Sequence, residues 1–298
     1  MVSRRTWVLF GAMCVIWGVP YLMIRVAVRE LTPATLVFAR TVLGAVILVP
    51  IAAARGELRH LWRYRWPLLA FAAVEIAMPW FFVGSAETRL PSSLTALLLA
   101  AVPLIGAVVA TFSGDDDALG GPRLIGLLLG LGGVVAIVGL DIGNTDALAL
   151  VEVAAVAVGY AVGPIILARW LSGVPGLGVI AVSLVACAVG YAPVAALQLP
   201  SSLPAGRVLA SVVGLAAICT ALAFVLFFRL IAEVGPTRAT VITYVNPAVA
   251  AVLGVTVLSE RFTAGMAAGF VLVLVGSFIA TRPPRGRSGS ATVVGAEP

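Results

Sequence analysis

Hydrophobic residues follow one another along this chain in long stretches, and short segments with charges and turn residues separate them. Most stretches have about 20 residues, the length at which an α-helix crosses the hydrocarbon core of a bilayer. Inside a bilayer only helices and closed barrels satisfy every backbone hydrogen bond. The pattern therefore predicts an all-α integral membrane protein. Ten membrane-spanning helices are expected at about 7–28, 33–53, 66–84, 92–112, 121–140, 147–170, 176–198, 208–228, 237–257 and 263–281.

The composition excludes a soluble protein. Hydrophobic residues make up 61% of the 298 residues and charged residues 11%, whereas an ordinary soluble domain is about one quarter charged. The first stretch follows Arg4 and Arg5 as in a signal peptide, but it is too long for a signal-peptide core, so a retained helix is expected. The three cysteines lie inside apolar stretches without metal-ligand spacing, so neither a metal nor another cofactor is expected.

The arginines set the expected orientation, because loops rich in basic residues stay in the cytoplasm. If the N-terminus is cytoplasmic, most arginines in loops fall on the cytoplasmic side. Those in loops on the outer side are Arg29, Arg89, Arg207 and Arg261. Both termini are therefore expected in the cytoplasm, with the protein in the plasma membrane. This topology explains the net charge of +6, and no nucleic-acid partner is expected.

The two halves of the chain resemble each other. A shift of 144 positions places Pro103 on Pro247 and Asp116 on Glu260. Five helices are thus expected twice, and because five is odd the two copies enter the membrane from opposite sides, as in many secondary transporters. The expected units are a first inverted five-helix repeat at 1–144, a second at 145–282 and a disordered cytoplasmic tail at 283–298.

Several motifs resemble the EamA-type branch of the drug/metabolite transporter superfamily. They are WGVPYLMIRVA at 17–27, SSLTALLLAAVPL at 92–104 and YVNPAVAAVLGVTVLSERFTAGMAAGFVLVLVG at 244–276. The resemblance implies a secondary active transporter that exports a small polar metabolite, such as an amino acid, or a drug by alternating access, and it leaves proton coupling open. Arg25 and Glu260 stand where the family carries a basic and an acidic residue, whereas the first half departs from the family with Asp116.

Two charges inside the predicted spans are the strongest candidates for a functional site. Arg40 lies near the middle of the second span, and Glu75 lies at the middle of the third. An Arg at this depth costs about 2.5–3.5 kcal/mol on insertion scales, and such groups mark substrate or proton pathways. Arg40 is expected to hold a carboxylate or phosphate, and Glu75 is expected to load and release a proton. The alternative is a structural ion pair between the two residues.

Aromatic and amide side chains within the spans complete the expected transport pathway, with ordinary packing as the alternative. These candidates are Trp17, Tyr21, Tyr160, Tyr244 and Asn246. Pro103 and Pro247 each remove a backbone donor and are expected to bend their helices at matching places. Such bends suit the discontinuous helices that bind substrates near the midplane of transporters, and a plain kink is the other reading.

Glycines four positions apart, at 126–130 and 265–269, predict close helix packing, either within one chain or across a homodimer. The other expected partners are membrane lipids and a small-molecule substrate. No GxxxxGK[ST] motif occurs, so transport driven by ATP on this chain is excluded, and no enzymatic activity is expected. The alternative function is a membrane-embedded enzyme that acts on a lipid substrate, but the single histidine, His60, lies in a basic loop without an evident partner.

Overall fold

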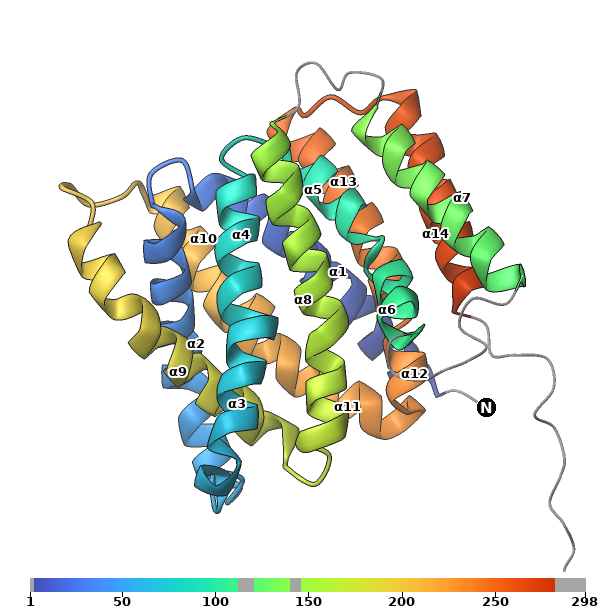
Figure 1. Cartoon of the computed structure of the whole chain (residues 1–298). Coiled ribbons are helices and arrows are strands. Elements are labelled where there is room, and N and C mark those ends of the chain that lie inside the picture. The colour runs from blue at the N-terminus through green and yellow to red at the C-terminus, as the bar shows by residue number, and fades with distance from the viewer. Residues whose placement is uncertain (1–2, 112–120, 140–145, 282–298) are drawn as a thin grey trace, which may run out of the picture.

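The structure is a computed structural model that describes residues 3–111, 121–139 and 146–281. Within those residues every regular element is helical. The helices form one bundle, and the chain runs back and forth between its two ends (Figure 1). We call the end that holds the beginning of α1 and the end of α14 the terminal face, and the other end the opposite face. Asp116 and the tail at 283–298 lie outside the described residues.

The observed helices follow the predicted spans in order. In the first half they are α1 (Arg4–Ala27), α2 (Pro33–Ala54), η1 (Leu61–Tyr64), α3 (Arg65–Phe71), η2 (Ala72–Ala77), α4 (Met78–Ala86), α5 (Ser92–Leu99), α6 (Val102–Thr111) and α7 (Gly121–Val138). In the second half they are α8 (Ala147–Trp170), α9 (Gly176–Leu197), α10 (Gly206–Ala216), η4 (Ala217–Leu222), α11 (Ala223–Val234), α12 (Pro236–Ala239), α13 (Ile242–Leu258) and α14 (Ala264–Ala280).

Several of these helices are long and apolar enough to cross a membrane. Among the described residues the segments that meet both conditions are Arg4–Ala27, Pro33–Ala54, Leu61–Ala86, Ser92–Val109, Ala147–Trp170, Gly176–Leu197 and Gly206–Val234. Shorter apolar helices occupy Pro122–Val138, Ile242–Leu258 and Ala264–Ala280. The predicted all-α fold is confirmed for the described residues, and the count of ten spans stays a prediction.

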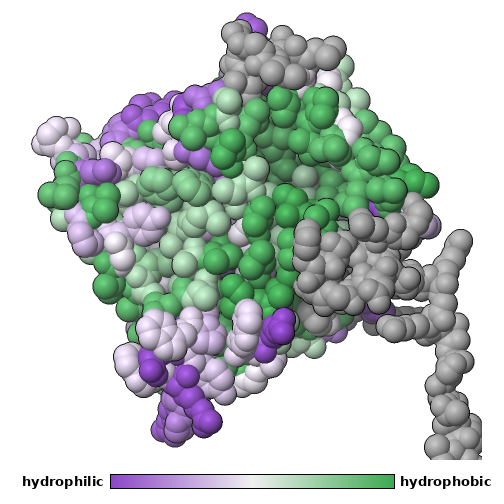
Figure 2. Space-filling view, viewed as in Figure 1, coloured by the Kyte–Doolittle hydropathy of each residue, from purple (hydrophilic) through white to green (hydrophobic). Residues whose placement is uncertain are grey.

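The sides of the bundle are apolar. Figure 2 shows hydrophobic residues over the middle of the molecule, with hydrophilic residues gathered toward the upper left and the bottom of the view. Large side chains such as Val46, Leu128, Val151 and Val189 are more than half exposed. A monomeric soluble protein rarely leaves so large an apolar surface uncovered, whereas lipid tails solvate it.

Two of the long spans contain a π-helical turn at matching places in the two halves. The turn η2 separates α3 from α4, and η4 separates α10 from α11. They begin at Ala72 and Ala217, which are 145 positions apart and agree to within one position with the repeat shift in the sequence. Turns of this kind are rare and frequently occur at functional sites. The turn η2 contains Glu75, and η4 contains Thr220.

The glycines of α7 and α14 pack these two helices against each other. A Cβ on Gly126 would lie 2.7 Å from the carbonyl oxygen of Gly276, and a Cβ on Gly133 would lie 2.6 Å from that of Gly269. Only glycine allows backbones to approach this closely. Figure 1 shows the two helices side by side along one edge of the bundle. The glycine pattern is thus used for packing within the chain, and a homodimer stays a prediction.

Candidate functional site

Arg40 lies deep in the bundle, with 7% of its surface exposed. It projects from α2, which is capped by Thr32: the Thr32 hydroxyl accepts a hydrogen bond from the backbone N–H of Thr35. The Nε of Arg40 donates to Oγ1 of Thr220 at 3.0 Å. Its guanidinium carbon lies 3.5 Å from the centroid of the Trp80 ring. These two contacts offset part of the cost of taking the charge out of water.

Thr220 belongs to η4, the π-helical turn of the second half. Its hydroxyl donates to the carbonyl oxygen of Leu215, five residues earlier, at 2.8 Å. Because the hydroxyl hydrogen has its own acceptor, the oxygen presents a lone pair to the Nε of Arg40. The two residues are 180 positions apart, so this bond joins the two halves of the chain.

Two tyrosines accompany the pair of Arg40 and Trp80. Tyr160 of α8 lies close enough to Trp80 of α4 for their polar groups to interact. Tyr160 and Tyr21, the latter on α1, are both close enough to Arg40 for electrostatic interaction. Hydroxyl and indole groups from three helices therefore gather around one buried cation.

Glu75 lies in η2, the π-helical turn of the first half. Its carboxylate lies against Gly163 of α8, where an added Cβ would collide with Oε2. That oxygen is buried and has no hydrogen-bond partner among the described residues, although the charge of Glu75 reaches Tyr160. No ion pair joins Glu75 to Arg40 within the described part of the chain, so the structural pair offered as an alternative is absent from this conformation.

The residues just described form what we call the central cluster. Its members are Tyr21, Arg40, Glu75, Trp80, Tyr160 and Thr220. Each half of the chain contributes to it, and each π-helical turn supplies one polar member. The cluster therefore has one cation, one carboxyl group and several hydroxyl groups in the interior of a membrane bundle, a combination suited to binding a polar solute.

Two other predicted pathway residues contact different groups. Trp17 packs against Phe224 and Phe227 of α11, with ring centroids 5.9 Å and 4.7 Å away. The hydroxyl of Tyr244 lies 3.5 Å from Oγ1 of Thr281, which follows the end of α14 at the terminal face. The structure thus places Trp17 in an aromatic contact between α1 and α11, and it places Tyr244 toward one end of the bundle.

Pro103 and Pro247 occupy different local structures. The fourth span is broken between α5 and α6, and Pro103 is the second residue of α6. Pro247 lies inside the continuous helix α13, and the break in the ninth span precedes that helix. Beside Pro247, the carbonyl oxygen of Asn246 would lie 2.9 Å from a Cβ on Gly18. The missing side chain at Gly18 lets α1 and α13 approach closely.

The sequence places Trp80 within a span, but neither Trp80 nor Thr220 was predicted as a site residue. A signal for Thr220 was present, because the repeat alignment places Glu75 on Cys219, the residue directly before it. Trp80 carried no such signal, since an aromatic residue in an apolar helix is usually part of the packing. Its role becomes visible only when the ring is placed beside Arg40.

Comparisons with known proteins agree with the helical fold. The model of the EamA-like transporter family matches residues 5–139 and, a second time, residues 147–282. No curated protein matches the chain. A solved structure described only as "Crystal structure of protein" is 23% identical to this chain, with 94% of this chain and 97% of that chain covered and a TM-score of 0.66, a likeness of fold alone. Because the family model matches both halves, this chain belongs to the EamA-like transporter family of the drug/metabolite transporter superfamily.

Proposed function

We propose that this protein is a secondary active transporter of the plasma membrane that exports a small polar metabolite with a carboxylate group, such as an amino acid, by alternating access. Its halves act as two inverted five-helix repeats of a ten-span bundle, with the terminal face in the cytoplasm. The observation that carries this proposal is the bond between Arg40 and Thr220, which places a buried cation between the two halves.

Arg40 has the chemistry to bind the acid group of such a substrate. Its Nε donates to Thr220, and one face of its guanidinium group lies over Trp80. Among the described residues, no carboxylate forms an ion pair with its two terminal nitrogens. Their N–H groups point along the edge of the plane, where a carboxylate accepts two parallel hydrogen bonds. Tyr21 and Tyr160 add hydroxyl groups for the polar remainder of the substrate.

A substrate reaches Arg40 only when the two halves move apart. Only 7% of the surface of Arg40 is exposed in this conformation, which leaves too little room for a substrate beside its guanidinium group. Separation at the terminal face admits substrate from the cytoplasm, and separation at the opposite face releases it outside. Glu75, whose Oε2 has no fixed partner among the described residues, is the proposed carrier of the coupled proton.

Transport from loaded proteoliposomes tests the proposal. The vesicles contain a mixture of amino acids, organic acids and neutral sugars, a pH gradient is imposed, and mass spectrometry follows which compounds leave. We expect carboxylate-bearing compounds to leave faster than they leave equally loaded vesicles without protein. Arg40→Gln should abolish this difference. Arg63→Gln is the matched control, because Arg63 is exposed in the loop element η1.

Exchange measurements separate binding from proton coupling. With substrate on both sides and no pH gradient, we expect Glu75→Gln to retain exchange and to lose acceleration by a pH gradient. Glu233→Gln, a carboxyl group paired with the exposed Arg5, should keep both. Carboxylate efflux that continues unchanged in Arg40→Gln contradicts the proposed substrate site, whereas an unchanged pH response in Glu75→Gln contradicts only the proton assignment.

A further inference from the structure

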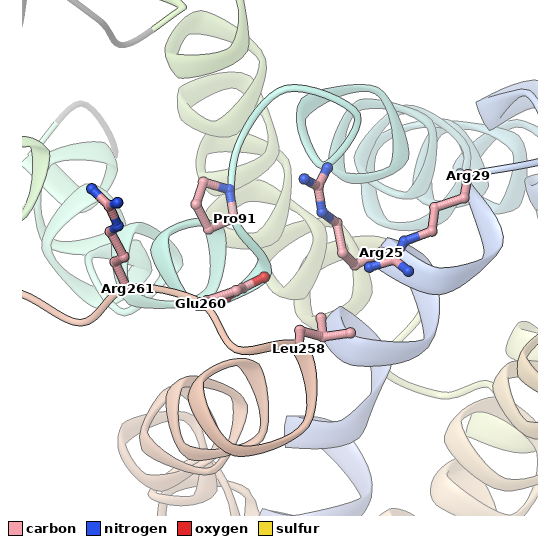
Figure 3. A pocket seen from close by; sticks show the side chains of 6 residues that line it. All are labelled: Arg25, Arg29, Pro91, Leu258, Glu260 and Arg261. Carbon is pink, nitrogen blue, oxygen red and sulfur yellow. The ribbon is translucent and has the colours of Figure 1, made fainter.

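A pocket of about 250 Å³ opens on the opposite face, at the end of α1. The residues that line it are Arg25, Arg29, Pro91, Leu258, Glu260 and Arg261, and we call it the arginine pocket. Figure 3 shows Arg25 extending from α1 and Arg29 from the turn that follows α1, with Arg261 extending from the loop after α13 on the other side of Pro91. Three of its six lining residues are therefore cations, and one is a carboxylate.

The carboxylate of Glu260 is already bound to the beginning of α5. Ser259 adopts a left-handed conformation with φ of 56°, which ends α13 and turns Glu260 toward α5. One carboxylate oxygen accepts hydrogen bonds from the backbone N–H of Ser92 at 2.8 Å and from its hydroxyl at 2.9 Å. The other accepts from the backbone N–H of Ser93 at 2.8 Å. Burial alone would raise the pKa of Glu260, but the hydrogen bonds from Ser93 and Ser92 outweigh burial and lower it.

Neither of the other acidic residues near the pocket supplies a partner for the arginines. Glu30, directly after Arg29, accepts from the backbone N–H of Ala205 at 2.8 Å and pairs with Arg207 at 3.6 Å. Glu87 is 0% exposed, and among the described residues both of its carboxylate oxygens lack a hydrogen-bond partner. Arg25 donates to the backbone carbonyl of Glu87 and not to its carboxylate.

The side chain of Glu87 does not line the pocket and is a weak counter-charge for Arg25, because burial disfavours its charged form. Burial raises the pKa of Glu87 well above its ordinary value, and the charge of Glu260 adds to this effect. The charge of Arg25 acts in the other direction without reversing it. The arginine pocket therefore keeps an excess of positive charge even after Glu260 is counted.

We propose that the arginine pocket is a binding site for a carboxylate or phosphate anion. Arg25 lies in the last turn of α1 and Arg29 in the turn that follows the helix, and both line the same pocket, where their like charges repel each other unless an anion lies between them. No carboxylate pairs with either guanidinium group among the described residues. Guanidinium groups bind carboxylate and phosphate with two parallel hydrogen bonds, which gives this pocket its selectivity for such anions.

The pocket limits the size of the anion. Ligand pockets for drug-sized molecules have volumes of about 300–1,000 Å³, so 250 Å³ holds an acid group with a small substituent. Leu258 adds an apolar wall on one side. The acid group has two sources at the end of a membrane helix: the phosphate of an anionic lipid headgroup, or a small soluble carboxylate or phosphate.

Binding to the intact protein distinguishes these sources. In one arm, native mass spectrometry measures retention of phosphatidylglycerol against phosphatidylcholine after release from mixed nanodiscs. In the other, isothermal titration in a neutral detergent measures binding of inorganic phosphate and of acetate. We expect one saturable anion per chain in at least one arm. Preferential phosphatidylglycerol identifies a lipid headgroup, and saturable phosphate or acetate identifies a soluble anion.

The variant Arg29→Gln/Arg261→Gln removes two exposed lining residues without touching the core. We expect it to weaken the saturable binding at least tenfold, whereas Arg63→Gln/Arg229→Gln, which removes the same charge from exposed positions elsewhere, should leave it unchanged. Arg29→Lys keeps the charge and should retain part of the binding. Absence of saturable binding in both arms, or equal loss in the two double variants, overturns the proposal.

Discussion

The guanidinium carbon of Arg40 lies 3.5 Å from the centroid of the Trp80 ring, which joins α2 to α4 by a cation–π contact. The same guanidinium group donates to Thr220 in the other half of the chain. A single cation is thus held by one partner that lies within its own half and by another across the interface. This arrangement allows the contribution of each partner to be measured separately.

Replacing Trp80 tests the first partner. Trp80→Phe keeps an aromatic face for Arg40 and loses only the indole N–H, whereas Trp80→Leu loses both. We expect Trp80→Leu to unfold more easily than Trp80→Phe by about 0.5–2 kcal/mol, the range of a cation–π contact. Unfolding in mixed micelles of increasing denaturing detergent measures the difference. Equal stability of the two variants would show that the ring face contributes nothing to holding Arg40.

Replacing Thr220 tests the second partner. Thr220→Val preserves the shape of the side chain and removes the acceptor for the Nε of Arg40. Because a buried donor is left unsatisfied, we expect a loss of about 1–3 kcal/mol in the free energy of unfolding. Thr256→Val is the matched control, since exposed Thr256 bonds only to Val252 in its own helix. A loss of similar size in both variants contradicts a specific role for the bond to Arg40.

Alanine at Gly276 tests the close packing of α7 and α14. A Cβ at this position would lie 2.5 Å from the carbonyl oxygen of Gly126, so we expect Gly276→Ala to destabilise the protein by about 1–3 kcal/mol. Gly132→Ala is the control, because no atom lies within 4 Å of a Cβ there. That variant should be neutral or slightly stabilising, as alanine favours a helix over glycine by about 0.5–1 kcal/mol. The prediction fails if Gly276→Ala is as stable as Gly132→Ala.

The link between Glu260 and the beginning of α5 predicts a dependence of stability on pH. The folded state lowers the pKa of Glu260 below its ordinary value of 4.5, because hydrogen bonds outweigh burial. The carboxylate therefore stabilises the fold fully above pH 4.5, and this contribution disappears as the pH falls through the lowered pKa. We expect Glu260→Gln to have a lower melting temperature than the parent at pH 7. The difference should shrink as the pH falls below 4.5, and a difference that is constant with pH would contradict the assignment.

The positions of the helices could be predicted from the sequence because the membrane imposes their length. The second span was expected at 33–53 and is observed at Pro33–Ala54, bounded by Thr32 and by Arg55. The third and eighth spans extend further than expected, from Leu61 and to Val234, because a helix continues into polar residues where it leaves the hydrocarbon. Hydropathy marks the apolar part of a helix and not its ends.

The π-helical turns and the partners of Arg40 could not be predicted in this way. Helices that are apolar on every side carry no periodicity that shows which face points inward. The bond from Arg40 to Thr220 joins residues 180 positions apart, and no local pattern encodes such a distance. The similarity of the two repeats does relate distant positions. The shift of 144 places Glu75 on Cys219, the residue directly before Thr220.

Glu87 shows a second limit of sequence reasoning. An acidic residue directly after an apolar stretch is typical of a solvated loop at the membrane surface. In the structure it caps α4, and its side chain is 0% exposed. The charge of Glu260, which is 173 positions further along the chain, acts on Glu87 in the fold, and no local pattern encodes such a neighbour.

The central claim is that the two halves open alternately around Arg40, and the native Cys219 tests it most directly. Cys219 directly precedes Thr220, is buried, and lies close enough to Arg40 for electrostatic interaction.

In a Cys14→Ser/Cys187→Ser background, a membrane-impermeant methanethiosulfonate reagent is added to one side of oriented vesicles at a time, and the modified chain is quantified by mass spectrometry. A Cys14→Ser/Cys219→Ser chain is the control, because the thiol of buried Cys187 donates to the carbonyl oxygen of Ala72, which is not one of the six cluster residues. Alternating access predicts that Cys219 is modified from either side and Cys187 from neither, and modification of Cys219 from one side alone, or from none, contradicts it.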